Sequence, residues 1–107
     1  TSWNTGQVPV ADHLTDHQRW VRDVRRKALG AALAAARQKA GLTQDELADA
    51  SGVSRPTISR IEQGTSSISS DRLWDLAYAC GTTPADLFGE AQADERDALD
   101  QHSTDSE

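Results

Sequence analysis

The sequence has few of the residues that crosslink a chain or hold a metal ion. It contains one cysteine, no methionine, three tryptophans, one tyrosine and one phenylalanine. Because Cys80 stands alone it cannot form an intramolecular disulfide, and its alanine neighbours are typical of a small buried side chain. The residues His13, His17 and His102 do not have the spacing of metal ligands. We therefore expect neither a metal ion nor any other cofactor.

The chain also lacks a long hydrophobic run and the residue groupings of an enzyme. No apolar stretch approaches the roughly 20 residues that cross a bilayer, and residues 1–10 do not have the order of a secretory signal. There is no nucleophile–base pair, no pair of carboxylates with an evident role and no phosphate-binding glycine loop. We expect a cytoplasmic protein that is not an enzyme and does not contact a membrane.

Residues that favour β-strands are scarce as well. Alanine is abundant and runs of β-branched residues are missing, which favours helices over sheets. With 107 residues the chain has the length of one domain. These observations predict an all-α fold.

The net charge of −6 argues at first sight against a nucleic-acid partner. The charges are unevenly distributed, however. Residues 19–90 hold ten of the eleven basic residues against nine acidic ones, whereas residues 91–107 hold one arginine against six acidic residues. Because DNA binding requires a local basic face rather than a basic total, the central part of the chain is compatible with it.

Helical periodicity begins near the N-terminus. Thr15 and Gln18 have the spacing of a capping box, which predicts a helix from Asp16. Apolar residues then recur at helical spacing at Trp20, Val21, Val24, Ala28, Leu29, Ala32, Leu33 and Ala36. The pattern fits one long helix to Ala40 or two helices that break near Gly30.

Four shorter helices follow. A second capping box begins at Thr43 and predicts a helix to about Ala50. Ser54 is expected to cap a helix over Arg55–Gln63, in which a proline in the first turn costs no hydrogen bond. Ser70 is expected to cap a helix over Asp71–Cys80. A last short helix carries Leu87 and Phe88 and is followed by Gly89. After Gly89, residues 93–99 either extend as a helix or belong to a disordered end.

The second and third of these helices form a helix pair with one polar face. On the third helix Ile58 and Ile61 are expected to point inward, and Gly52 lies where the intervening turn needs a residue that tolerates positive φ. The opposite face then carries Arg55, Pro56, Ser59, Arg60 and Gln63. Two arginines on such a face are suited to bidentate contacts with guanine in a major groove.

The stretch RQKAGLTQDELADASGVSRPTISRIEQG, residues 37–64, closely resembles the Cro/repressor-type (XRE) helix-turn-helix family. The resemblance covers roughly residues 29–89 and implies a five-helix, lambda-repressor-like DNA-binding domain from a bacterium or a phage. It implies base reading by Arg55, Pro56, Ser59 and Arg60. It implies phosphate or backbone contacts by Gln44, Ser54, Thr57 and Gln63. It also implies an internal ion pair between Arg37 and Glu62.

This resemblance divides the chain into four segments. They are an N-terminal arm (residues 1–14), a helical extension (15–28), the DNA-binding domain (29–89) with its helix-turn-helix at 44–63, and an acidic tail (90–107). The low hydrophobicity and high charge of the tail predict partial disorder.

Two features outside the family core leave alternatives open. The basic cluster Arg22, Arg25, Arg26 and Lys27 is either a solvated helix face or a phosphate contact, which would compensate for a loop, residues 65–70, without lysine or arginine. A set of apolar residues ahead of the family core either packs on the same domain or forms a dimer seam, alone or with Leu87 and Phe88. The set is Trp3, Trp20, Val21 and Val24.

The sequence therefore predicts a sequence-specific transcriptional regulator that binds double-stranded DNA, with repression as the default mechanism. A single small domain buries little DNA surface, so we expect a homodimer on a palindromic or tandem operator. An alternative is an antitoxin whose acidic tail wraps a basic toxin, and the N-terminal arm is a second candidate for a protein partner. A third is a protein-interaction adaptor that does not bind DNA.

Overall fold

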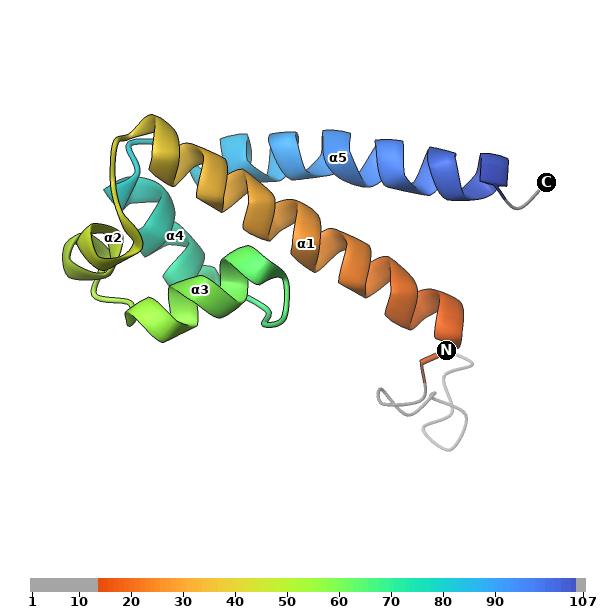
Figure 1. Ribbon diagram of the computed structural model, residues 1–107, viewed down its shortest axis with the longest axis horizontal. Coiled ribbons are helices and arrows are strands. Elements are labelled where there is room, and N and C mark those ends of the chain that lie inside the picture. The colour runs from red at the N-terminus through yellow and green to blue at the C-terminus, as the bar shows by residue number, and fades with distance from the viewer. Residues whose placement is uncertain (1–13, 106–107) are drawn as a thin grey trace, which may run out of the picture.

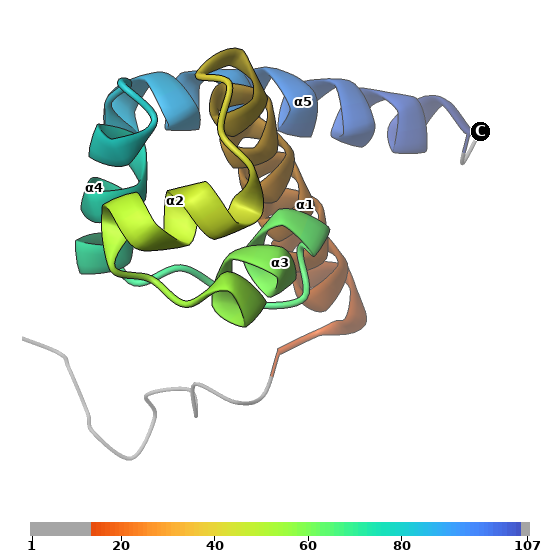
Figure 2. The same cartoon turned by 60° about the vertical axis from the view of Figure 1, so that its left-hand side comes forward.

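The computed structural model describes residues 14–105, which form five α-helices and no β-strand (Figures 1 and 2). The helices are α1 (Asp16–Lys39), α2 (Gln44–Ser51), α3 (Arg55–Gln63), α4 (Ser70–Ala79) and α5 (Pro84–Asp105). The predicted all-α, five-helix class is confirmed. The predicted N-terminal arm lies outside the described residues except for its last residue, Leu14.

Helix α1 is one continuous helix of 24 residues. The side chain of Thr15 accepts a hydrogen bond from the backbone of Gln18, and the Gln18 side chain accepts one from the backbone of Thr15, so the predicted capping box is present. Of the two alternatives, the unbroken helix is observed. The segment boundary expected between residues 28 and 29 falls inside α1.

Gly30 lies inside α1 because α1 and α3 cross there at very short range. It is buried, and a Cβ atom built on it would lie 2.1 Å from the carbonyl oxygen of Ile61 and 2.9 Å from that of Glu62. No side chain fits between two backbones at this distance. The residue that looked like a helix break in the sequence is therefore a packing requirement.

The helix-turn-helix itself is built from local signals. Thr43 caps α2 through a complete capping box with Glu46, and the side chain of Ser54 caps α3 by accepting from the backbone of Thr57. Gly52 ends α2 in the left-handed conformation, with φ 76°. This turn sends the chain from α2 into α3 within three residues, Gly52 to Ser54.

The start of α4 differs from the prediction by one residue. Ser69, not Ser70, is the N-cap, because its hydroxyl oxygen accepts from the backbone N–H of Arg72. The helix ends at Ala79 and Cys80 caps it. Residues 66–70 contain four serines, and the sequence alone does not show which of them is the N-cap.

The last helix is longer than the short helix that the sequence predicted, and it includes residues 93–99, for which the sequence left a helix open. Helix α5 continues through Gly89 to Asp105. It packs along α1, with Ala91 buried and Leu99 half-buried, while Gly89 has no neighbour within 4 Å of an added Cβ. Burial of this stripe compensates for the low helix propensity of glycine.

All five helices contribute to one hydrophobic core. Its buried members are Ala28, Ala32, Leu33, Leu47, Val53, Ile58, Ile61, Leu73, Leu76, Ala77, Cys80, Leu87 and Ala91. Burial raises the pKa of the Cys80 thiol, so the residue behaves as a small apolar side chain. The long helices α1 and α5 reach past the group formed by α2, α3 and α4 (Figure 1). None of the described helices is both long enough and apolar enough to span a bilayer.

The close crossing of α1 and α3 predicts opposite effects of alanine at two glycines. Gly30→Ala should lower the free energy of unfolding by about 2 kcal/mol, because the added methyl group forces the two backbones apart. That loss corresponds to a fall in Tm of roughly 10 °C for a domain of this size. Thermal and urea unfolding followed by circular dichroism measure both quantities.

The matched control is Gly89→Ala, where an added Cβ meets open space. It should raise the free energy of unfolding by about 0.5–1 kcal/mol through helix propensity alone. Equal effects of the two substitutions would contradict the close packing of α1 on α3.

Candidate nucleic-acid interface

Helix α3 has one buried face and one polar face. Thr57, Ile58 and Ile61 are buried against the body of the domain. On the opposite side Arg55, Pro56, Arg60 and Gln63 are exposed and Ser59 is half-buried. The amide nitrogen of Gln63 donates to the Ser59 hydroxyl at 3.2 Å. The polar face that the sequence predicts is therefore present on a regular helix, with both arginines in solvent.

Arg55 makes an ion pair that the sequence analysis did not predict. Its Nε atom lies 3.3 Å from Oδ1 of Asp45 on α2, and the two side chains are 61% and 77% exposed. An ion pair this exposed contributes little to stability, so the guanidinium exchanges it readily for another anion. Asp45 lies in the first turn of α2 and Arg55 is the first residue of α3, so the pair depends on how the two helices pack and has no local signal in the sequence.

Arg60 is hydrogen-bonded to Thr57, whose hydroxyl is also bonded to that of Ser54. Its Nη2 atom donates to the Thr57 hydroxyl oxygen at 3.4 Å, and the Ser54 hydroxyl donates to the same oxygen at 2.8 Å. Thr57 is only 9% exposed. Its hydroxyl is already engaged by two neighbours, and the expected contact of Thr57 with the DNA backbone stays a prediction. In the structure Thr57 orients Arg60 and Ser54.

Glu62 joins three helices through its carboxylate. Arg37 on α1 donates from Nε to Oε2 at 2.7 Å and from Nη2 to Oε1 at 3.0 Å. The amide nitrogen of Gln44, the first residue of α2, donates to Oε1 at 3.0 Å. A third donor of Arg37, Nη1, binds the carbonyl oxygen of Leu42 at 2.8 Å. Arg37 and Glu62 thus form a bidentate ion pair, and Gln44 completes the network.

This network is shielded from solvent. The Arg37 and Glu62 side chains are 13% and 8% exposed. The hydrogen bonds from the guanidinium to the Glu62 carboxylate raise the pKa of Arg37 above its ordinary value, so Arg37 stays charged. A charged pair with two parallel hydrogen bonds has one favoured geometry. It therefore sets the angle at which α3 leaves the body of the domain.

The extension residues pack within the chain. Trp20 on α1 stacks on His102 of α5, with ring centroids 4.3 Å apart. Val21 and Val24 are half-buried. Leu87 is 1% exposed and belongs to the core, so it is not available as a dimer contact. Among the predicted seam residues that lie within residues 14–105, only Phe88 is largely exposed, at 48%.

Two further exposed aromatic residues were missed by the sequence analysis. Trp74 and Tyr78 on α4 are 65% and 87% exposed. The signal was present, because Leu73, Leu76 and Ala77 form the inward stripe of α4 and leave positions 74 and 78 on the outer side. Within residues 14–105 no three metal-ligating side chains come together.

The Glu62 network generates a stability prediction. Glu62→Gln keeps the shape but removes the charge that Arg37 requires, so we expect a loss of about 3 kcal/mol in the free energy of unfolding. The matched control is Asp45→Asn, which breaks the exposed pair with Arg55 and should cost less than about 1 kcal/mol. Urea unfolding of both variants at neutral pH measures the difference. A similarly small loss of free energy of unfolding in Glu62→Gln and Asp45→Asn would show that the network does not hold α3.

Comparison with known proteins agrees with this geometry. Residues 33–87 match the helix-turn-helix family model. A crystal structure of the clp gene regulator ClgR from Corynebacterium glutamicum is 36% identical, has a TM-score of 0.71 and covers 77% of this chain and 87% of that one. A second ClgR structure from the same species is 41% identical, has a TM-score of 0.64 and covers 66% of this chain and 91% of that one.

Among curated proteins, none matches the chain. The residues that match the family model include the whole of α3. The predicted family resemblance is confirmed: the chain belongs to the XRE-type helix-turn-helix family of DNA-binding transcriptional regulators.

Proposed function

We propose that this regulator recognises a specific operator through α3 and represses transcription by occupying it. The observation that carries the proposal is the exposed pair Arg55 and Arg60 on a helix whose angle is fixed by the Arg37–Glu62 ion pair. A bidentate contact with guanine requires a guanidinium held in register with the base edge. A rigidly positioned recognition helix provides that register.

Each side chain of the polar face has a role in this proposal. Arg55 and Arg60 contact O6 and N7 of guanines, Pro56 packs on a thymine methyl group, and Ser59 binds either kind of base. The weak pair between Arg55 and Asp45 opens when the base is bound.

The backbone contacts come from neighbouring positions. Ser54 and Gln63 lie exposed at the two ends of α3. Gln44 begins α2, and the free backbone N–H groups of that first turn suit a phosphate. Its side chain is already engaged with Glu62, so Gln44 also links the phosphate contact to the orientation of α3.

The arginine pair gives the test of this proposal. Operators are first selected from a randomised duplex library with the full chain. Arg55→Ala/Arg60→Ala should lower the ratio of specific to non-specific affinity roughly a hundredfold, because each bidentate pair is worth about 1–3 kcal/mol of discrimination. Arg96→Ala, an exposed arginine on α5, is the control and should leave the ratio intact. Unchanged discrimination in the double variant would refute base reading by α3.

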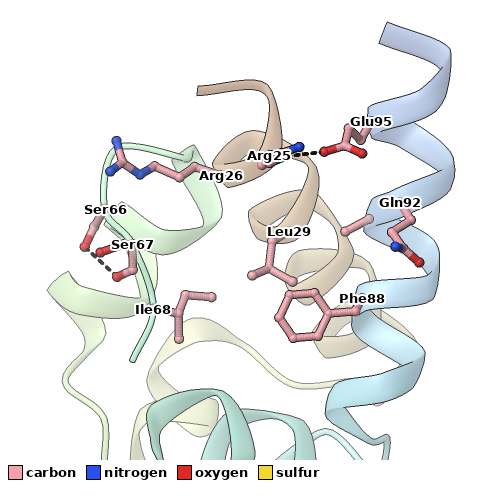
Figure 3. Close-up of a pocket in the computed structure, with 10 residues that line it drawn as sticks. Arg25, Arg26, Leu29, Ser66, Ser67, Ile68, Phe88, Gln92 and Glu95 are labelled. Carbon is pink, nitrogen blue, oxygen red and sulfur yellow. Dashed lines mark hydrogen bonds and ion pairs between the residues drawn. The ribbon is translucent and has the colours of Figure 1, made fainter. Parts of the chain in front are cut away.

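The homodimer is part of the same proposal, because two half-sites about 34 Å apart give a selectivity that one domain does not. Phe88 supports a seam on α5. With Leu29 and Ile68 it lines a groove of 510 Å³ between α1, the α3–α4 loop and α5 (Figure 3). A second copy that packs its own Phe88 on the apolar end of this groove buries both rings in an isologous contact and leaves the guanidinium of Arg26, on the side of Ser66, outside the seam.

Sedimentation velocity tests the seam. Phe88→Glu should convert a dimer into a monomer and weaken operator binding, because it places a charge in the apolar contact. Ala93→Glu introduces the same charge at another exposed position of α5 and should leave the dimer intact. A dimer that survives Phe88→Glu would exclude this groove as the seam.

The antitoxin alternative relied on an acidic tail that is free to wrap a partner. Residues 90–105 instead continue α5, which packs on α1. No observation on the described residues favours that role, and we do not extend the proposal to it.

A further inference from the structure

We propose that α1 carries a phosphate-binding surface, formed by Arg26 and Lys27, that grips the DNA backbone beside the C-terminal end of α3. The inference rests on the proposed function and deepens it, because it adds a contact outside the residues 33–87 that match the family. The sequence left two alternatives for the basic cluster on α1. The structure separates the members of this cluster by what each of them contacts.

Lys27 packs directly on the end of the recognition helix. Gly64 caps α3, and a Cβ atom built on Gly64 would lie 2.5 Å from Cγ and 2.8 Å from Cα of Lys27. The stem of the lysine therefore lies against the α3 C-terminus. Lys27 is exposed, and its ammonium group extends into solvent from a stem that is packed on the end of α3.

Arg26 lies over the loop that follows α3. It lines the groove together with Ser66 and Ser67, and Figure 3 shows its guanidinium on the side of these serines, away from α5. The loop, residues 65–69, contains no lysine or arginine of its own. Arg26 thus provides a positive charge above an uncharged stretch of backbone.

Neither cation has a strong partner within the described residues. The nearest carboxylate to Arg26 is that of Asp23, 4.0 Å away in an exposed pair. No carboxylate of residues 14–102 forms an ion pair with Lys27. Arg25 differs, because it points to α5 and donates to Glu95 there (Figure 3). Of the four residues in the cluster, Arg25 therefore joins the two long helices, and Arg26 and Lys27 are available to an anion. Arg22 is exposed on α1, farther from the end of α3.

The direction of α1 brings this surface towards a duplex on α3. Helix α3 lies at the lower edge of the group formed by α2, α3 and α4 in both views (Figures 1 and 2). Its polar face is the side opposite the buried Ile58 and Ile61. The N-terminal half of α1 descends beside α3 to the same level in both views. A duplex in contact with this face would pass the end of α3 with a sugar–phosphate backbone next to α1. Phosphate contacts at that place fix register without reading sequence.

Lys27 has an alternative role, because a cation near the C-terminus of α3 interacts favourably with the helix dipole. The two roles have different signatures. A dipole contact changes the stability of the free protein and leaves the salt dependence of binding unchanged. A phosphate contact changes the slope of log K against log salt by about 0.9.

The test is a salt titration of operator binding from 50 to 400 mM with the full-length chain. Arg26→Gln/Lys27→Gln should reduce the magnitude of the slope by about 1.8, so that affinity falls about 12-fold less than wild type between 50 and 200 mM. The ratio of specific to non-specific affinity should stay unchanged, because phosphates carry no sequence information. The swap Arg26→Lys/Lys27→Arg should restore the wild-type slope.

The control is Arg25→Gln/Arg96→Gln, which removes the same net charge from the α1–α5 side and should not change the slope. Single Arg26→Gln should reduce it by about 0.9 and serves as the second variant if the double variant melts early. An equal slope for the test and control variants would overturn the proposal. The same titration on random-sequence DNA separates this failure from a failure of operator recognition.

Discussion

The structure depends on one carboxylate that three helices share. Glu62 is nearly buried and charged, so it requires partners, and it has them in the guanidinium of Arg37 and the amide of Gln44. Because these donors come from α1 and α2, the angle of α3 cannot change without breaking a shielded ion pair. The polar face with its two arginines is exposed, and its usefulness for recognition rests on this buried contact behind it.

A second constraint acts through the backbone. Gly30 lets α1 cross α3 with main chain against main chain, and this crossing brings Lys27 onto the cap of α3. The long first helix is thus more than an extension added to the DNA-binding domain. On one side its N-terminal half contacts α5 through Trp20 and Arg25, and on another side it carries the charged surface proposed to lie beside the DNA.

The position of α5 explains how a chain with a net charge of −6 belongs to a DNA-binding family. Most of the acidic residues after position 90 extend along α5, which lies on the opposite side of the molecule from α3 in both views (Figures 1 and 2). Repulsion between charges decreases with distance and is screened within about 10 Å at ordinary ionic strength. Net charge is therefore a poor guide to the field at the face of α3.

The sequence by itself determined the elements whose signals are local. Capping boxes place the starts of α1 and α2, Gly52 makes the turn, and the motif of residues 37–64 identifies the family, because these features involve neighbours within a few residues. Only the tertiary structure decided that Gly30 and Gly89 lie inside helices, that Thr57 is covered and that Arg55 pairs with Asp45. Each of these depends on which helix lies opposite, and contacts between residues far apart in the chain leave no periodic trace in the sequence.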